Sequence, residues 1–187
     1  MRGPLKKEML ACFKKQIETR LSQFKPIPEN RDPWIWEWRV EGNRTFFVLL
    51  QPMEKRDQFT VEVSWSESGQ FPWGEIGTRK IDRPIGRLRL PNLWAHDEVG
   101  DVWDVDPAKS AGARLHLDAL RKGVSGPYPV DSPIDQILPG IPALVIDAVD
   151  KLVQFGLPLF QQVAEVRKWR VLQRKCDKPE STSTGER

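Results

Sequence analysis

The side chains best suited to acid–base chemistry lie in one acidic run, residues 96–106 (HDEVGDVWDVD). His96 could exchange protons if Asp97 or Asp101 oriented it, because a catalytic imidazole needs a positioned partner within hydrogen-bond reach. The run also offers oxygen ligands, but not in the order that wraps calcium. The simpler interpretation is an acidic loop that ends in a helix cap at Asp106. Since no constellation is complete, we predict no catalytic residue, no metal and no cofactor.

Other candidates for chemistry lack the context that they need. His116 lies in a predicted helix and fits a surface or core-edge position equally well. Ser125, in the sequence GVSG, has neither the GxSxG spacing nor a preceding strand. Cys12 and Cys176 lie near opposite ends of the chain and are expected to be reduced thiols. Phosphate-binding glycine motifs are absent. An unrecognised hydrolase is therefore the third functional hypothesis.

Charge is unevenly distributed although the chain of 187 residues has a net charge of only +3. The most acidic stretch, residues 97–106, carries five carboxylates and no basic residue. Dense charge can set association rate and partner choice, so this stretch is the candidate surface for a protein partner. The residues predicted to contact the partner are Asp97, Glu98, Asp101 and Asp104. Solvated faces are the commoner explanation of such charge blocks.

A basic stretch supports an alternative, an accessory protein that binds nucleic acid. It combines five cations with one carboxylate, and the cations are Arg79, Lys80, Arg83, Arg87 and Arg89. Cations and aromatic rings together could hold phosphates and stack bases. The aromatic residues, however, alternate on predicted strands elsewhere in the chain, and no recognised motif unites the two groups.

The elements that must position these side chains begin with an amphipathic helix over residues 5–24, where apolar residues recur at three- and four-residue spacing. Alternation then predicts strands over 34–40 and 58–66, and an apolar run predicts another over 45–50. RLRL at 87–90 fits a short fourth strand, while the Pro, Gly and Trp residues around it fit a long ordered loop. The middle strand is apolar at nearly every position, which is typical of a strand covered on both faces.

The first strand carries a row of tryptophans: Trp34, Trp36 and Trp38. With Gly42 and Asn43 as a two-residue hairpin turn, Trp38 would face Phe47 and Trp36 would face Leu49. Three indoles left in water would form a large apolar patch. Core packing under a helix is therefore the favoured interpretation of the row, with ligand or partner contact as the alternative.

Helical signals return after the acidic run. Asp106 and Pro107 predict the start of a helix over 107–122, and the sequence SPID at 132–135 repeats that start signal. A further helix opens at Pro142, is broken by Gly156 and Pro158, and is followed by a last helix over 158–175. The polar end, residues 178–187, is predicted to be a disordered tail.

Strands and helices are segregated along the chain, which favours an α+β fold over a doubly wound one. We predict a single domain, residues 1–177, in which an antiparallel sheet of three to four strands packs with an N-terminal helix and C-terminal helices. No stretch approaches the roughly 20 apolar residues of a membrane span, and the N-terminus does not resemble a secretory signal. We therefore expect a cytoplasmic protein without a membrane partner.

Two segments add a resemblance to small bacterial proteins of unknown function: FTVEVSW at 59–65 and LVQFGLPLFQQV at 152–163. Those proteins also begin with an amphipathic helix, continue with a tryptophan-containing hairpin and end with a broken helix, and this order covers residues 5–172. The resemblance implies an α+β fold and, because proteins of this kind can accompany bacterial toxins, an immunity role. The leading hypothesis is thus a non-enzymatic factor that binds a protein, either a toxin or a subunit of a complex.

Overall fold

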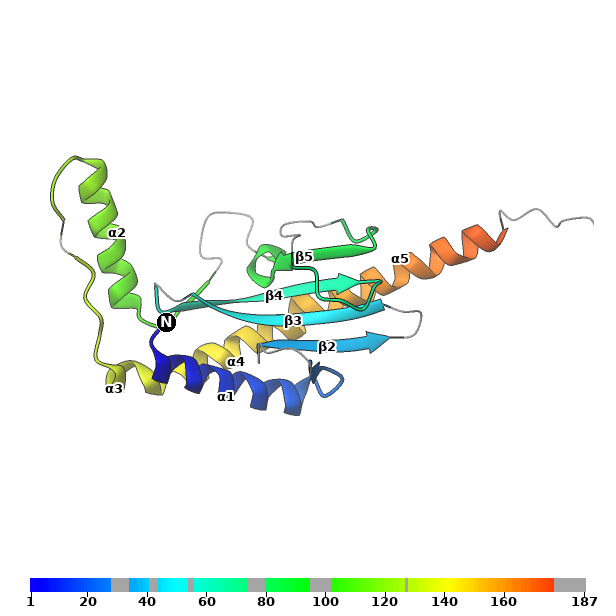
Figure 1. Ribbon diagram of the computed structural model, residues 1–187, viewed down its shortest axis with the longest axis horizontal. Coiled ribbons are helices and arrows are strands. Elements are labelled where there is room, and N and C mark those ends of the chain that lie inside the picture. The colour runs from blue at the N-terminus through cyan, green and yellow to red at the C-terminus, as the bar shows by residue number, and fades with distance from the viewer. Residues whose placement is uncertain are drawn as a thin grey trace, which may run out of the picture.

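The computed structural model describes residues 1–27, 34–40, 44–53, 56–73, 80–94, 102–126 and 128–176, with side chains up to residue 166. An antiparallel sheet carries three helices along one face, α1 (Gly3–Arg20), α4 (Ile141–Lys151) and α5 (Leu157–Cys176) (Figure 1). Helix α2 (Pro107–Arg121) stands away from the sheet at one end, and the short α3 (Ile134–Ile137) connects it back to α4. The α+β class is confirmed. The predicted tail, 178–187, lies outside the described residues.

The sheet has six strands, more than the three to four predicted. They are β1 (Lys25–Pro26), β2 (Ile35–Val40), β3 (Arg44–Met53), β4 (Gln58–Ser66), β5 (Ile85–Arg89) and β6 (Trp103–Asp104). Their order is β1-β2-β3-β4-β5, and β6 also pairs with β4. The extra strands, β1 and β6, have two residues each. Two residues are too few for an alternating pattern to reveal a strand in the sequence.

The predicted register of the first hairpin is wrong by one residue. Trp36 pairs with Val48 and Trp38 with Phe46, because the last pair, Val40 with Arg44, leaves three residues between the strands instead of two. A shift of one residue moves every partner side chain to the opposite face of the sheet. The tryptophan row therefore shares its face with Phe46 and Val48, not with Phe47 and Leu49.

The tryptophan row packs in the core, as predicted. Trp36 is 1% exposed, and its ring centroid lies 5.2 Å from that of Phe13 on α1. Trp38 is partly buried and contacts the rings of Phe24 and Phe46. Helix α1 supplies the cover because the apolar residues of its inner face fall at four-residue intervals: Leu5, Met9, Phe13 and Ile17.

The predicted break between the last two helices is also wrong. A π-helical turn, Leu152–Gly156, joins α4 to α5 without interruption. Pro158 follows this wider turn, where local changes in the i→i−4 hydrogen-bond ladder accommodate a missing N–H. A Cβ on Gly156 would lie 2.6 Å from Leu152 Cδ1 and 3.5 Å from Val63 Cγ1. Gly156 therefore serves close packing of the helix on the sheet rather than helix termination.

The sheet face opposite these helices is also largely buried, although its side chains are partly polar. All nine residues of β4 are buried, including Glu62, which forms an ion pair with Arg87 of β5. Beside this pair lies a second apolar cluster formed by Ile35, Phe47, Leu49 and Phe71. Both faces of β4 are thus buried, including the face that carries Thr60, Glu62 and Ser64. Within the described part of the chain, no helix is long and apolar enough to cross a membrane.

Candidate protein-binding arm

Helix α2 and the segment after it form an arm, which we define as residues 107–126 and 128–130. Asp106 starts the helix because its carboxylate accepts a hydrogen bond from the Lys109 N–H at 3.1 Å, and Pro107 occupies the first turn. The helix ends at Arg121 with Lys122 as its C-cap, and Gly123 takes a φ of +71° that lets the chain reverse. The predicted helix over 107–122 is confirmed.

The returning segment packs along one face of α2. The ring of Tyr128 stacks on His116 with 4.6 Å between centroids, and His116 Nδ1 lies 3.2 Å from the carbonyl oxygen of Gly126. A Cβ on Gly126 would come within 2.6 Å of the Ala119 Cβ, so glycine is required for this approach. His116 therefore holds the arm together, and it is not part of an acid–base pair among the described residues.

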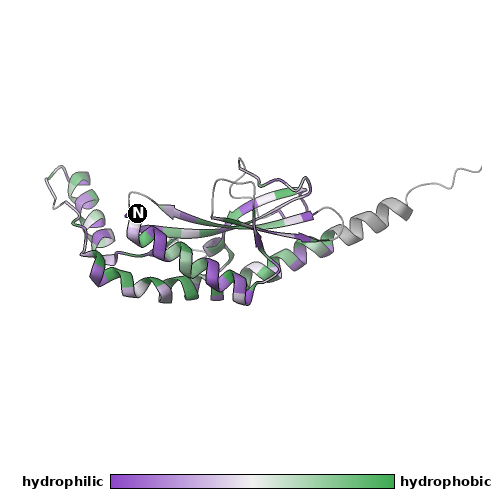
Figure 2. Cartoon of the chain, turned by 60° about the horizontal axis from the view of Figure 1, so that its bottom comes forward, coloured by the Kyte–Doolittle hydropathy of each residue, from purple (hydrophilic) through white to green (hydrophobic). Residues whose placement is uncertain are grey.

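The arm exposes most of the apolar surface that a partner could use. The described surface exposes eight large apolar side chains, and the arm carries six of them: Leu115, Leu117, Leu120, Val124, Tyr128 and Val130. Only Ser110 of α2 is buried, and no other described helix or strand packs extensively along α2. Figure 2 shows green, hydrophobic segments along the helix that stands apart from the body. Exposed apolar side chains concentrated on one projecting element are typical of an interaction site.

Buried charges fix the arm to the body. We call this network the root, and its residues are Arg2, Asp57, Asp106, Lys109 and Ser132. Asp57 lies in the turn before β4, and its Oδ2 atom is 3.0 Å from both Arg2 Nε and Lys109 Nζ. Asp106 accepts from Arg2 Nη2 at 3.1 Å and from the Ser132 hydroxyl at 2.7 Å. The root thus joins the N-terminus, the sheet and both ends of the arm.

The root also shifts the pKa of its charged groups. Burial alone would raise the pKa of Asp57, but hydrogen bonds from Lys109 and the Arg2 backbone outweigh it and lower this pKa. Asp106 behaves alike, since hydrogen bonds from Ser132 and Lys109 lower its pKa against the effect of burial. Burial would lower the pKa of Lys109, whereas its bonds to Asp131 and Asp57 raise it. All three groups therefore stay charged at neutral pH.

Most of the predicted acidic surface lies outside the described residues, namely Asp97, Glu98 and Asp101. The structure describes Asp104, which is half-buried. Its carboxylate accepts hydrogen bonds from Gln58 Nε2 and, at 2.6 Å, from the Ser110 hydroxyl. Asp104 thus helps to fix α2 to β4 in the folded chain.

The predicted basic stretch does not form one exposed surface in the described part of the chain. Arg79 lies outside the described residues, while Lys80 and Arg83 are exposed. Arg87 is 4% exposed, is paired with Glu62, and donates to the Trp73 carbonyl at 2.9 Å. Arg89 is half-buried at the end of β5. At most part of the stretch is therefore available to phosphates.

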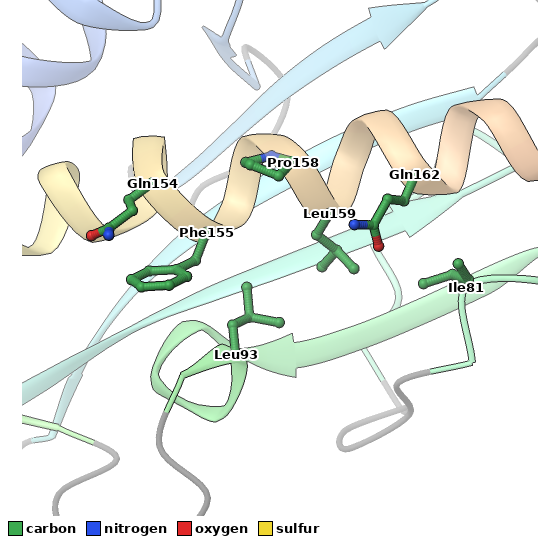
Figure 3. Close-up of a pocket in the computed structure, with 7 residues that line it drawn as sticks. All are labelled: Ile81, Leu93, Gln154, Phe155, Pro158, Leu159 and Gln162. Carbon is green, nitrogen blue, oxygen red and sulfur yellow. The ribbon is translucent and has the colours of Figure 1, made fainter.

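One pocket, of about 390 Å³, lies between α5, the π turn and the region around β5 (Figure 3). Apolar side chains form most of its wall, and two amides flank it; the lining residues are Ile81, Leu93, Gln154, Phe155, Pro158, Leu159 and Gln162. None of them is an acid, a base or a nucleophile at neutral pH.

Among the described residues, no group of three or more His, Cys, Asp or Glu side chains is arranged to hold a metal ion.

Comparison of the chain with protein-family models, curated proteins and solved structures finds no match. The fold and the site define an α+β protein with a projecting helical arm. The helix of the arm was predicted from the sequence, but its exposure was not. The signal was present in α2, where Leu115 and Leu117 lie on different sides of the helix, too widely spread for a single buried face.

Proposed function

We propose that this protein is a non-enzymatic factor that binds another protein through its arm. The observation that supports the proposal most strongly is the concentration of six of eight exposed large apolar side chains on one projecting element. A soluble protein rarely concentrates exposed apolar side chains on one element unless that element is an interaction site. The root adds rigidity, because a surface held in a fixed position loses less conformational entropy on binding.

A toxin-neutralising role is a narrower form of the same proposal. It rests on the resemblance of residues 59–65 and 152–163 to small bacterial proteins. In this form the partner is a toxin, and the acidic residues Asp97, Glu98 and Asp101 remain a predicted second contact that could steer association. A toxin gene beside the gene for this chain would support the narrower proposal.

The test is co-purification from native cell extract with a double variant of α2, which we call the ridge variant, and a matched control. Leu117→Asp with Leu120→Asp places two charges on the exposed apolar surface of α2. Ala111→Asp with Ser125→Asp adds the same charge at exposed positions elsewhere on the arm. We expect a stoichiometric protein with the wild type and the control, and its loss with the ridge variant. Recovery of nucleic acid alone, released at high salt, would overturn the proposal.

A further inference from the structure

One side of α2 carries a narrow apolar ridge, which we define as Ala113, Leu117 and Leu120. Their spacing of four and three residues places them on one stripe of the helix, with a rise of about 10 Å from first to last. Leu117 is 49% and Leu120 53% exposed. A stripe of this spacing is the pattern by which one helix packs against another.

Two arginines follow the same edge of the ridge. Arg114 and Arg121 each come one residue after a ridge residue, so a rotation of about 100° per residue places both on one side of the stripe. Both are exposed. The opposite edge is occupied by His116 and Tyr128, whose rings stack. The ridge is therefore bordered by positive charge on its one open edge.

A second copy of this chain does not fit that edge. An antiparallel pair of α2 helices joined along the ridge would bring Arg114 of one copy beside Arg121 of the other, twice by symmetry. Like charges at such positions are destabilising. The nearest carboxylate, Asp118, lies farther around the helix and is 3.6 Å from Arg121 of its own chain. A partner with carboxylates at the flanking positions would remove this repulsion.

We infer that the ridge binds an acidic amphipathic helix of a partner protein, whose apolar residues pack on Leu117 and Leu120 and whose carboxylates pair with Arg114 and Arg121. This inference rests on the proposed function and specifies the chemistry of the partner. A lipid surface fits less well. A helix that lies in a membrane interface needs a broad apolar face with basic residues on its polar side, whereas this ridge is narrow and has cations along one edge.

The test measures binding of two synthetic helical peptides to the full chain by fluorescence anisotropy. Both peptides carry the same leucine stripe, and their flanking positions are either Glu or Lys. We expect the Glu peptide to bind about tenfold more tightly, the scale of two exposed ion pairs set against repulsion. Arg114→Glu with Arg121→Glu should reverse this preference. The matched control, Lys7→Glu with Lys15→Glu, makes the same charge change at exposed positions of α1. This control should keep the preference for the Glu peptide.

Asp118→Asn gives a finer result, because it removes the carboxylate that competes for Arg121. It should tighten binding of the Glu peptide about twofold, the scale of one weak exposed pair. Leu117→Asp with Leu120→Asp should abolish binding of both peptides.

Four outcomes would overturn the inference: equal affinity for the two peptides, no binding of either, dimerisation of the free chain through the ridge, or tighter capture by vesicles of phosphatidylserine and phosphatidylcholine. Equal peptide affinity together with loss of the native partner in the ridge variant would refute only the acidic preference. Retention of that partner by the ridge variant would refute the proposed function itself.

Discussion

The body and the arm use similar apolar residues for different purposes. In the body, Leu5 and Trp36 are at most 1% exposed between α1 and the sheet. In the arm, Leu115 and Leu120 are more than half exposed on α2, a helix that buries only Ser110. The comparison shows that an apolar stripe identifies a surface to be covered but does not say which molecule covers it. Substitutions in the body should therefore change stability, whereas substitutions on the exposed surface of the arm should change binding.

The largest effect is expected in the body. Trp36→Ala removes a buried indole that contacts Phe13, and should lower the free energy of unfolding by about 3 to 5 kcal/mol. Leu117→Ala should change it by less than about 0.5 kcal/mol, since surface substitutions have small effects. Urea denaturation of both variants measures the difference. Equal losses would show that the arm is part of the folded core.

The next largest effect is expected in the root. Asp57→Asn keeps the shape of the side chain but removes the carboxylate that Arg2 and Lys109 share. The cost should be about 1.5 to 3 kcal/mol, the scale of hydrogen bonds to a charged group, because Arg2 keeps Asp106 and Lys109 keeps Asp131. Asn also tolerates the φ of +46° at this position. Hydrogen exchange should show faster opening of α2 than in Asp118→Asn, an exposed control. Unchanged exchange in α2 would mean that the root does not hold the arm.

Acid should weaken the root through its carboxyl groups. The pKa of Asp57 and of Asp106 lies below the ordinary value of 3.8 in the folded state. Their contribution is therefore full above the ordinary pKa and is lost as the pH falls through the lower folded pKa. The contribution of Lys109 to stability depends on pH in the opposite direction. Folding raises its pKa above the ordinary 10.5, so this contribution is lost as the pH rises through the higher folded pKa.

Unfolding free energies measured from pH 7 to pH 2 should consequently fall below about pH 4. The fall should be shallower in Asp57→Asn, which lacks one of the two shifted carboxyl groups, and unchanged in Asp118→Asn. Identical acid profiles for the wild type and Asp57→Asn would exclude a stabilising charge on Asp57.

A smaller effect is expected within the arm itself. Gly126→Ala would place a Cβ 2.6 Å from that of Ala119 and should push the returning segment off α2, at about 1 to 3 kcal/mol. The matched control is Gly140→Ala, where nothing lies within 4 Å of the added Cβ. Circular dichroism during thermal unfolding compares the two variants. Equal melting temperatures would show that the arm does not need its close packing.

Local pattern predicted much of the fold, and long-range pairing explains what it missed. The strand over 58–66 and the Asp106 helix cap were predicted because each depends on neighbouring residues. The hairpin register was missed by one residue because the loop length changes which side chains face each other. The continuous helix through Gly156 was missed because glycine usually indicates a helix end. Here glycine is needed because a Cβ at this position would lie too close to Leu152 in the packed π turn.

The candidate site was harder to predict than the fold. Its helix could be read from the sequence, but exposure depends on how the whole chain folds. The root brings Arg2, Asp57 and Asp106 together from positions far apart in sequence. No local spacing relates these three residues, so only the folded chain reveals that they fix the arm.

The central claim is that the apolar surface of the arm serves binding rather than folding. The most direct test measures two properties of one protein, Leu117→Asp with Leu120→Asp: its free energy of unfolding and its recovery of the native partner. We predict an unfolding free energy within about 1 kcal/mol of the wild type for two surface substitutions, together with complete loss of the partner. Retention of the partner, or unfolding of the domain, would contradict the account.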